Sequence, residues 1–550
     1  MKNKSALQHD FAKVPTVSKP RSTFNRSHSY KTTFDADYLV PVYFNNVLPG
    51  DTVNLRHSFL VRLLSPMIKP VMDNIYLDWF YFFVPYRLVW NNFEKFMGAQ
   101  ENPGDSISYL VPQCTGPNVA AGGIPVGSLH DYLGLPTGPL NVGGGTTGIT
   151  FNNLIPRAYS LCWNKWMRDE NLQTSVTVGM GDGPDTFSDY NILKRGKRHD
   201  YFTSALPFLQ KGTAVQLPLG TSAPVSGNTA IGYTQPEGYD DNSYINPVFF
   251  DTNAGGAVSG SIVSVPQIYW YGVVPAIPFT GVADLSTATA ATINQLRQSI
   301  ALQQFLENDA RGGTRYTEII KQRFGVVSLD ARLQRPELLS LGSSQIKISQ
   351  VASTSDNGTP TASNNYAVGS LAAFGTGGDV GNGFFKSFTE HGVVLGLVCV
   401  RSDINYQHGL DRHWSYRTRY DFYNIEFANL GEQEVLNKEI FAYCPDGTSA
   451  TQKNGVFGYQ ERYAEERYSR NLITGKLRSQ ATTSLDLWHL AENFTSLPTL
   501  GATFIRQGSI VPIDRAIAIP SEPQFIFDAY FDDKWARVMP TYGVPGLTRL

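Results

Sequence analysis

Hydrophobic and polar residues alternate along residues 53–63, which read VNLRHSFLVRL. Side chains of an extended chain point alternately to opposite faces, so this period of two predicts a β-strand with one apolar face. The opposite face carries polar positions, among them Arg56 and Arg62. The residues predicted on the apolar face are Val53, Leu55, Phe59, Val61 and Leu63.

Other segments extend this β pattern. Residues 74–85, NIYLDWFYFFVP, are apolar at almost every position, which predicts a strand that is covered on both faces. Residues 391–403, HGVVLGLVCVRSD, and residues 415–427, SYRTRYDFYNIEF, predict two more strands. Helices are fewer and are predicted over residues 85–97, 156–170 and 286–310, with a short helix ending at Phe324. The chain is therefore predicted to be mainly β.

Positive charge is segregated along the chain. Residues 96–156, 212–296 and 348–385 contain no Lys or Arg, and Gly, Ser, Thr, Asn and Pro gather there. We interpret these three stretches as long loops or insertions on the β scaffold. The formal net charge is −2, so the chain as a whole cannot neutralise a nucleic acid. Any contact with nucleic acid has to be local or to involve a separate basic partner.

Residues 1–34 differ from the rest of the chain and are interpreted as a basic N-terminal arm. Residues 1–31 hold seven Lys and Arg residues against the single acidic residue Asp10. An arm of this composition has too little apolar area to fold alone. Its cations are Lys2, Lys4, Lys13, Lys19, Arg21, Arg26 and Lys31.

Length and composition exclude several classes of protein. The chain of 550 residues is 42% hydrophobic, which is enough for a large core. Its four cysteines are far apart, so no dense disulfide framework is expected. The N-terminus lacks the apolar region of a secretory signal, and no apolar run is long enough to span a membrane. We expect a soluble protein made in a cytoplasm.

No segment predicts an active site. Residues 143–148, GGGTTG, fit the spacing of a dinucleotide-binding turn, but prolines flank them and no strand–helix–strand pattern follows. His408 and His413 are five residues apart without the glutamate of a zinc protease helix. The carboxylate pairs at 432/434 and 465/466 lie among cations, which favours ion pairing. We predict no catalytic, cofactor-binding or metal-binding residues, and no enzyme.

The segment 457–470, FGYQERYAEERYSR, combines three arginines with four aromatic residues. Cations and ring faces suit a groove for single-stranded nucleic acid, but three glutamates cancel the positive charge. The residues leave three interpretations open: a nucleic-acid site, a catalytic carboxylate cluster, or a contact surface between folded chains.

Long blocks of the sequence carry a resemblance to a known family. They include NVLPGDTV, MDNIYLDWFYFFVP, HDYFTSALPFLQKG, NDARGGTRYTEII, FGVVSLDARLQRPELL, the run from SFTEHGVVLGLVCV to NLGEQEV, and FGYQERYAEERYS. These blocks extend over most of the chain. The match to the family is lost where composition predicts loops, mainly within residues 112–150, 213–285 and 351–383. The chain resembles the major capsid protein of gokushoviruses, small tailless single-stranded DNA bacteriophages of the Microviridae.

The resemblance implies a fold and a function. The fold would be a single viral jelly roll, an eight-stranded antiparallel β-sandwich with long interstrand insertions and a few helices. The protein would self-assemble in the host bacterial cytoplasm into the T=1 icosahedral shell of a virion that encloses circular single-stranded DNA. The implied partners are an internal scaffolding protein, a small basic DNA-binding protein, a DNA pilot protein and a host surface receptor.

In such a shell the basic arm is predicted to be ordered by assembly, on the inner surface near DNA or beneath a neighbouring subunit. Its seven cations, from Lys2 to Lys31, are then the candidate DNA contacts. An ordered tail with no role in DNA binding remains an equal alternative.

Composition and resemblance together predict how the chain is divided. The arm is followed by a first part of the jelly-roll core at residues 35–211, with its loop at 96–156, and a second part at residues 297–550, with its loop at 348–385. Residues 212–296 are predicted to be an outward insertion that forms a threefold protrusion used in host attachment. This segment is acidic and lacks cations, which disfavours a place beside DNA. The protrusion candidates are Ile268, Tyr269, Trp270 and Tyr271.

For a shell protein, the segment 457–470 is best interpreted as a contact surface, because mixed charge and tyrosines suit contacts between subunits. The candidate intersubunit contacts are Tyr459, Arg462, Tyr463, Glu465, Arg467 and Tyr468. The rival function is a β-sandwich carbohydrate-binding protein or a glycan-acting enzyme. Such an enzyme is expected to have a pocket with convergent polar groups.

Overall fold

A computed structural model of the chain describes residues 20–118, 121–138, 148–213, 293–311, 334–354, 368–443, 450–506 and 510–542. The chain divides into two compact units, one made of residues 1–209 and 309–550 and the other of residues 210–308. All strands within the described ranges belong to the first unit. In the second unit the described residues are 210–213 and the part of helix α4 (Ile293–Arg311) that precedes Asp309.

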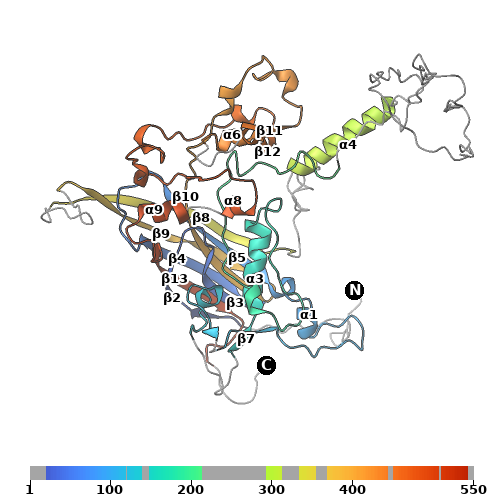
Figure 1. Cartoon of the computed structure of the whole chain (residues 1–550). Helices are drawn as coiled ribbons and strands as arrows, with labels where there is room; N and C mark the ends of the chain where they lie inside the picture. Colours follow the sequence, from blue (N-terminus) through green and yellow to red (C-terminus); the bar gives the residue numbers. More distant parts are fainter. Residues whose placement is uncertain are drawn as a thin grey trace, which may run out of the picture. The chain divides into compact units, whose positions relative to one another are not determined.

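The first unit contains two antiparallel four-stranded layers (Figure 1). One layer has the order β2 (His28–Phe34), β13 (Phe525–Arg537), β4 (Thr52–Leu63) and β9 (Leu371–Ser387), and β1 (Ser22–Asn25) extends it beside β13. The other has the order β3 (Val40–Val47), β10 (Gly392–Ser402), β5 (Ile75–Pro85) and β8 (Glu337–Ala352). The two layers are joined because β8 pairs first with β5 and then with β9. The nine strands form one continuous curled sheet, and the eight strands other than β1 have the two-layer arrangement of the predicted jelly roll.

The main core lies between the two layers. The inward side chains of β4 and β13 pack against those of β5 and β10, and Leu77, Val394 and Phe527 are fully buried there. Alternate residues of β4 are buried, as its sequence predicts, and His57 joins the buried set. Its imidazole stacks on Phe59, with a distance of 3.8 Å between ring centroids, and contacts the Tyr81 hydroxyl at 3.0 Å.

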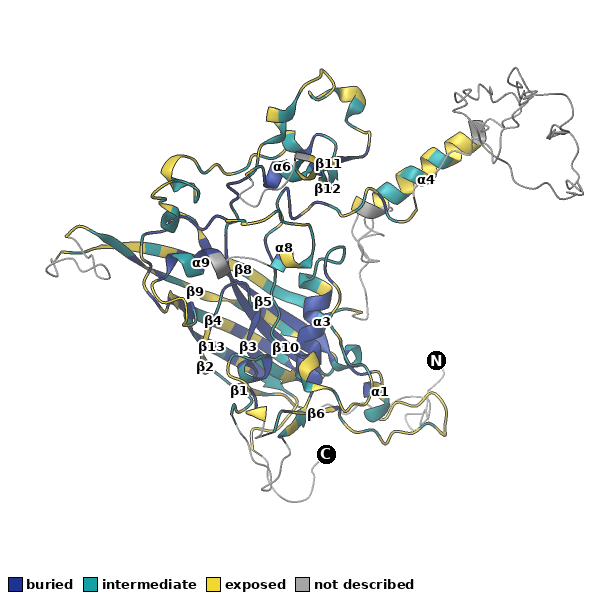
Figure 2. Cartoon of the chain, in the orientation of Figure 1, coloured by how far each residue is buried: buried dark blue, intermediate teal, exposed yellow. Residues whose placement is uncertain are grey.

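A second core covers the outer face of the β3–β10–β5–β8 layer. Phe82 on β5 and Leu395 on β10 point away from the main core and pack in a cluster with Tyr159 and Trp163. Tyr159 belongs to α3 (Leu154–Cys162), which continues into a π-helical turn, Trp163–Met167. Figure 2 shows α3 as a buried element beside β5 and β10. The prediction that residues 74–85 form a strand covered on both faces is confirmed.

The outer face of the β2–β13–β4–β9 layer is different. Its outward residues are exposed along all four strands, and exposed segments recur on β4, β9 and β13 in Figure 2. No helix among the described residues packs over it. We call the outward-facing residues of β2, β13, β4, β9 and the adjoining end of β8 the open face.

Shorter elements decorate the unit. Helix α3 and its π-helical turn cover most of the predicted helix 156–170, and α4 covers residues 293–310 of the predicted helix 286–310. Residues 286–292 and the predicted short helix ending at Phe324 lie outside the described ranges. The predicted helix 85–97 is reduced to a 3₁₀ turn and a single helical turn, and Pro85 belongs to β5. None of the helices in the described ranges is long and apolar enough to span a membrane. The remaining elements are α1 (Phe93–Phe96), α2 (Leu129–Tyr132), α6 (Asn437–Ile440), α7 (Ala450–Lys453), α8 (Ala502–Arg506), α9 (Ile510–Ala516), β6 (Gln113–Thr115), β7 (Thr150–Asn152), β11 (Glu432–Leu436) and β12 (Val456–Glu461).

The strand predicted over residues 415–427 is wrong. The segment contains irregular backbone between 3₁₀ turns at Arg412–Ser415 and Ile425–Phe427. The carboxylate of Asp421 accepts the backbone N–H groups of Arg417 at 2.9 Å and Thr418 at 2.7 Å. An aspartate that captures backbone donors in this way closes a turn, which competes with an extended chain.

The loop predicted over residues 348–385 is also wrong at both ends. Residues 348–352 belong to β8 and residues 371–385 belong to β9, while residues 355–367 lie outside the described ranges. The glycines of β9 suggested a loop, but they serve close packing: a Cβ on Gly383 would lie 2.0 Å from the Leu55 carbonyl oxygen. Only glycine allows the two backbones to approach so closely.

The predicted basic arm is too long at its C-terminal end. Residues 22–25 and 28–34 form β1 and β2, which pair with β13, and Phe34 is 2% exposed in the main core. Residues 1–19 lie outside the described ranges. The predicted insertion at 212–296 also stays a prediction, because residues 214–292 are outside the described ranges.

Candidate functional site

The C-terminal half of the segment 457–470 forms one wall of a cavity. Strand β12 pairs with β11, and Tyr459 also exchanges two backbone hydrogen bonds of 2.8 Å with Leu206. The chain then reverses at Tyr463, whose backbone is left-handed with φ of 59°, and enters the 3₁₀ turn Ala464–Glu466. This reversal carries Glu465 and Tyr468 to the same side as helix α6.

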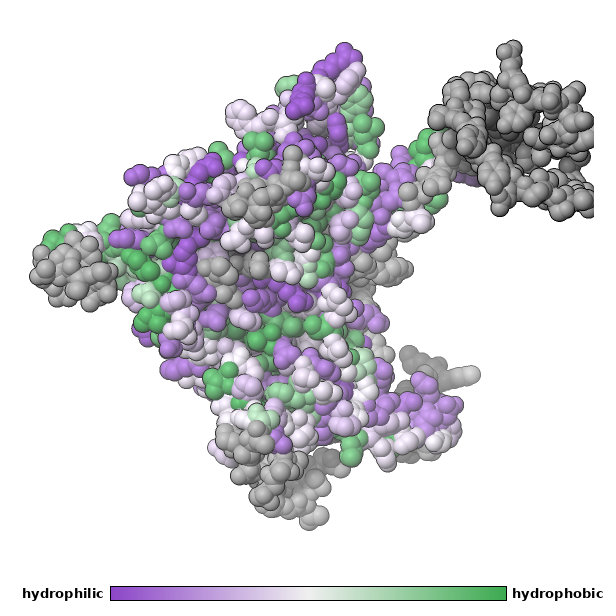
Figure 3. All heavy atoms as spheres, in the orientation of Figure 1, coloured by the Kyte–Doolittle hydropathy of each residue, from purple (hydrophilic) through white to green (hydrophobic). Residues whose placement is uncertain are grey.

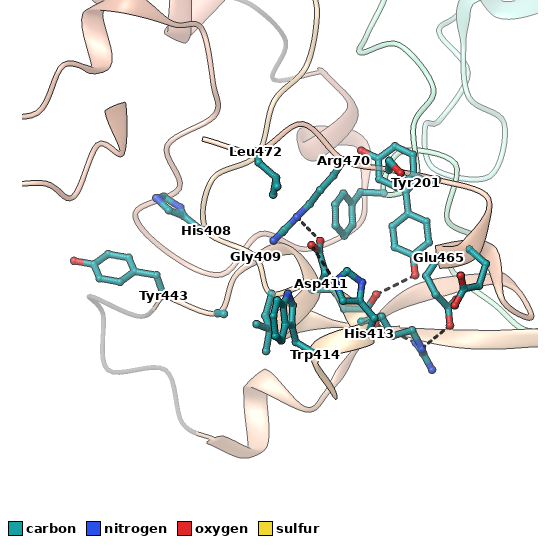
Figure 4. A pocket seen from close by; sticks show the side chains of 18 of the residues that line it. Tyr201, His408, Gly409, Asp411, His413, Trp414, Tyr443, Glu465, Arg470 and Leu472 are labelled. Atoms are coloured by element: carbon teal, nitrogen blue, oxygen red, sulfur yellow. Dashed lines mark hydrogen bonds and ion pairs between the residues drawn. The ribbon is translucent and has the colours of Figure 1, made fainter. Parts of the chain in front are cut away.

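The cavity has a volume of about 810 Å³ and is lined by aromatic and charged side chains (Figure 4). Tyr201 and Glu465 lie on one side, whereas His408 and Tyr443 lie on the other. The remaining charged and aromatic residues of its lining are Phe202, Asp411, Arg412, His413, Trp414, Glu439, Glu466, Tyr468, Arg470 and Arg478.

Arg412 holds two carboxylates in this cavity. Its Nη1 lies 3.0 Å from Glu439 Oε1, and its Nε lies 3.4 Å from Glu465 Oε1. Tyr201 donates its hydroxyl to the other Glu439 oxygen at 2.9 Å. Burial disfavours the charge of Arg412, but Glu439 and Glu465 outweigh burial and raise its pKa. Burial raises the pKa of Glu439 although Arg412 and the Leu436 N–H oppose that effect.

A second ion pair joins Arg470 to Asp411 across the cavity, as Figure 4 shows. Tyr468, two residues before Arg470, stacks on Tyr201 with 5.5 Å between ring centroids and 8° between the ring planes. Burial raises the pKa of Tyr468 to about 12. The stacked rings of Tyr201 and Tyr468 are therefore fixed by contacts within this chain.

His408 is the unusual member of the cavity lining. It is 4% exposed, and neither ring nitrogen has a hydrogen-bond partner among the described residues. Its ring packs edge-on against Phe441 at 5.7 Å. Burial lowers its pKa to about 4, and Arg478 adds to this effect. The imidazole is consequently neutral near pH 7.

Most carboxylates of the cavity are paired with arginines or tyrosine hydroxyls. Asp411, Glu439 and Glu465 face arginines, and Glu466 accepts the Tyr416 hydroxyl at 3.1 Å. Each of these carboxylates is already engaged by a guanidinium or a hydroxyl group of its own chain. Within the described ranges no group of three or more His, Cys, Asp and Glu residues could hold a metal ion. The arrangement is suited to holding loops together and to contacting a partner.

The sequence was compared with protein families and with individual proteins. Residues 12–547 match the family described as capsid protein (F protein). The chain belongs to this family of phage capsid proteins. Capsid protein VP1 of Bdellovibrio phage phiMH2K is 46% identical over 98% of this chain and 97% of its own length. Capsid protein VP1 of Chlamydia phage 1 is 40% identical over 99% of both chains.

A third relative, capsid protein VP1 of Spiroplasma virus 4, is 33% identical over all of this chain and 99% of its own length. These matches confirm the predicted membership among gokushovirus-type capsid proteins of the Microviridae. The chain is therefore a structural component of a virion, and capsid proteins of this family assemble into a multimeric shell.

The structure places the six predicted contact residues of this capsid protein in two environments. Tyr463 is 2% exposed, Glu465 points into the cavity, and Tyr468 stacks on Tyr201, so these three support their own chain. The other three are accessible: Tyr459 is half-buried, Arg462 lies over the Tyr463 ring, and Arg467 pairs with Glu461 at the surface. Their role between subunits stays a prediction.

Three of the seven predicted DNA contacts lie in the described ranges, and all of them have neighbours. Arg21 donates to the Thr52 hydroxyl at 3.3 Å, and Arg26 donates to Asn45 at 2.6 Å. Lys31 pairs with Asp528 at 3.2 Å. The other four, and the protrusion candidates at 268–271, lie outside the described ranges.

The sequence analysis missed two exposed regions. Residues 414–430 carry Trp414, Phe422 and Ile425, whose exposed fractions are 72%, 59% and 77%. The pattern had placed most of this segment in a strand. The open face was also missed as a site, although its cations Arg56 and Arg62 were recognised on the polar side of β4.

Proposed function

We propose that this capsid protein assembles into a T=1 icosahedral shell that encloses circular single-stranded DNA. The observation that carries the proposal is a complete eight-stranded jelly roll in a chain that matches the capsid family over residues 12–547. A closed shell of identical subunits needs heterologous surfaces that complement one another. Hydrophobic and hydrophilic residues are interspersed on the side of the molecule drawn in Figure 3, which suits such contacts.

The intersubunit contacts are proposed to include the accessible part of the segment 457–470. Arg462 and Arg467 present cations there, and Tyr423 and Ile425 are exposed in the neighbouring segment 414–430. Aromatic residues and arginines together are typical of protein interfaces. The mixed charge of the region disfavours a nucleic-acid partner.

The segment 212–296 is proposed to be an outward threefold insertion that attaches the particle to its host. Its composition supports this role, since it has no Lys or Arg but carries Glu237, Asp240, Asp241, Asp251 and Asp284. Such a segment beside DNA would face phosphates without any cation to offset the repulsion. Replacement of residues 222–242 by a short Gly-Ser linker is expected to leave shells intact and to impair adsorption to the host. Unchanged infectivity would remove the attachment role.

The partners proposed for assembly are an internal scaffolding protein, a small basic DNA-binding protein and a DNA pilot protein, in the cytoplasm of the host bacterium. The net charge of −2 supports a separate basic protein, because the shell protein alone cannot neutralise a genome. No enzymatic activity is proposed. The cavity gives no support to a glycan-acting enzyme, since its carboxylates are ion-paired.

Electron microscopy of the purified protein and of virions that carry it tests the proposal. Closed particles of 60 identical subunits, the number that T=1 symmetry requires, are the expected result. A small soluble oligomer that turns over a glycan, with turnover abolished by one substitution in the cavity, would contradict it. A soluble oligomer without activity would leave the family assignment intact and exclude autonomous assembly, so the scaffolding protein would be added next.

A further inference from the structure

The open face gathers the positive charge of one sheet on one surface. Cross-strand pairing places Arg62 of β4 opposite Thr376 of β9, and Thr376 opposite Lys347 of β8. Directly paired residues point to the same face of a sheet, so Arg62 and Lys347 flank one row. Arg56 lies six residues before Arg62 on the same strand and face, which is about 20 Å away at the usual rise per residue.

The cations of the open face outnumber its carboxylates by five to two. The carboxylates are already engaged, since Asp528 pairs with Lys31 at 3.2 Å and Asp532 with Lys534 at 3.5 Å. Arg56, Arg62 and Lys347 are exposed and have no ion-pair partner among the described residues. These three cations thus give the face a net positive charge in a chain whose net charge is −2.

Three exposed aromatic rings lie on this face, and two of them are close to Arg56. Tyr530 of β13 is 51% exposed and Phe385 of β9 is 72% exposed. The third, Phe374 of β9, is 46% exposed and lies opposite Ser349 of β8. Tyr530 lies opposite Ser58, two residues after Arg56, and Phe385 lies opposite Asn54, two residues before Arg56 on the same face. Arg56 is therefore diagonal to both rings. Its direct neighbour on β9 is Gly383, which has no side chain to cover it. Its direct neighbour on β13 is Asp532, whose carboxylate pairs with Lys534 at 3.5 Å.

We propose that the open face binds single-stranded DNA without sequence specificity. Arg56, Arg62 and Lys347 contact phosphates, while Tyr530 and Phe385 stack on bases, as in other surfaces that bind single strands. Ring faces are available only to bases that are not already stacked in a duplex. The inference rests on the proposed function, because it requires this sheet to face the genome inside the shell.

A protein partner fits this surface less well. The buried centre of a protein interface is depleted in charged residues, and an unpaired cation there is costly to desolvate. Phosphates instead supply the missing negative charges and release counterions as they bind. Strand β4 therefore contributes apolar side chains to the core and cations to the genome surface from alternate positions.

Binding of a fluorescent 30-nucleotide oligo(dT) to the purified full-length chain tests the proposal. The variant Arg56→Gln/Arg62→Gln/Lys347→Gln is expected to bind at least about tenfold more weakly at moderate salt. Its plot of log affinity against log salt is expected to be less steep than wild type by about 2, from about 0.7 for each of three phosphates. Tyr530→Ser/Phe385→Ser should weaken binding about tenfold and leave the salt dependence unchanged.

A matched control removes the same charge elsewhere. Arg417→Gln/Arg419→Gln/Lys476→Gln changes three exposed cations away from the sheet and should bind oligo(dT) like wild type. An equal loss in this control, or unchanged binding in the open-face variant, would overturn the proposal. Thermal unfolding of each variant verifies that these exposed substitutions leave the fold intact.

Particle formation, observed by microscopy on wild type and the open-face variant, separates the inference from the proposed function. Shells that form normally but package or bind less DNA are the expected result for the open-face variant. Normal DNA binding combined with failed assembly would show that the open face is a protein interface, which overturns the inference but not the shell. If wild type forms no shells with its scaffolding protein present, the proposed function fails whatever the affinity for DNA.

Discussion

The outer faces of the two jelly-roll layers contrast within one chain. The β3–β10–β5–β8 layer is covered by α3 and neighbouring segments, and its outward residues, such as Phe82 and Leu395, are apolar and buried. The open face of the other layer carries cations and exposed rings, and no described helix packs over it. The outward residues of a sheet are apolar where other segments of the chain pack over them, and polar where solvent reaches them. The face without a cover is consequently free to meet a partner.

The largest difference between the two faces is expected for phenylalanine truncation. Phe82→Ala on the covered face should lower the free energy of unfolding by about 3 to 5 kcal/mol, because it leaves a cavity against Trp166. Phe385→Ala on the open face should change it by at most about 0.5 kcal/mol. Urea denaturation of both variants measures the difference. Similar losses would mean that Phe385 is covered and that the contrast is false.

A smaller effect is expected where the cover depends on a buried ion pair. The guanidinium of Arg157 on α3 donates two hydrogen bonds of 2.6 Å to Asp185 and a further one of 3.0 Å to the Val89 carbonyl. Arg157→Lys keeps the charge but loses this planar fork, so it should cost about 2 kcal/mol. The measurement is the urea midpoint, with the exposed Arg417→Lys as control. A loss below about 0.5 kcal/mol would show that the fork does not hold the cover.

Low pH should also destabilise the segments that pack over the β3–β10–β5–β8 layer. His130 of α2 is buried between Phe151 and Phe187, and burial lowers its pKa to about 4 from its ordinary value near 6.5. Between these values the unfolded chain binds a proton that the folded chain excludes, so stability should fall as the pH drops from about 6.5 to about 4.

The variant His130→Phe should flatten this pH dependence without abolishing it, since His408 has a similarly lowered pKa. Urea midpoints at pH 7 and pH 5 give the comparison, with the exposed His413→Phe as control. If His130→Phe and wild type lose equal stability between these pH values, His130 is not buried neutral in the cover.

The smallest effect is expected for the ion pair on the open face. Lys31→Met removes the partner of Asp528, but both side chains are exposed, so the loss should be below about 1 kcal/mol. Thermal unfolding measures it, and added salt should weaken the pair further. A loss above about 2 kcal/mol would indicate that this part of the open face is buried.

Much of the fold could be predicted from periodicity. The alternation along β4 and the continuous apolar run of β5 gave the faces of both strands correctly. Residues 415–427 misled because aromatic residues suit strands, whereas Asp421 captures backbone donors and closes a turn. The glycines of β9 led to the opposite error, in which a strand was predicted to be a loop. Glycine is favoured both in flexible loops and where two backbones pack closely, so its presence does not separate the two cases.

The candidate site was less predictable, since its relevant neighbours are far away in the sequence. The mixed charges of 457–470 correctly indicated ion pairing, but Arg412 and Tyr201, which partner Glu465 and Tyr468, cannot be found from local pattern. The open face has a clearer signal: Arg56 and Arg62 alternate with core residues on β4. The sequence pattern does not show which of the two layers is packed against helices on its outer face.

A cryo-electron microscopy reconstruction of virions that carry this chain tests the central claim most directly. We predict a T=1 shell in which the β2–β13–β4–β9 layer lines the interior, with density for DNA against Arg56, Arg62 and Lys347. The insertion at 212–296 should lie on the outer surface at the threefold axes. An open face on the outside of the particle, or one buried between subunits without DNA, would contradict the account.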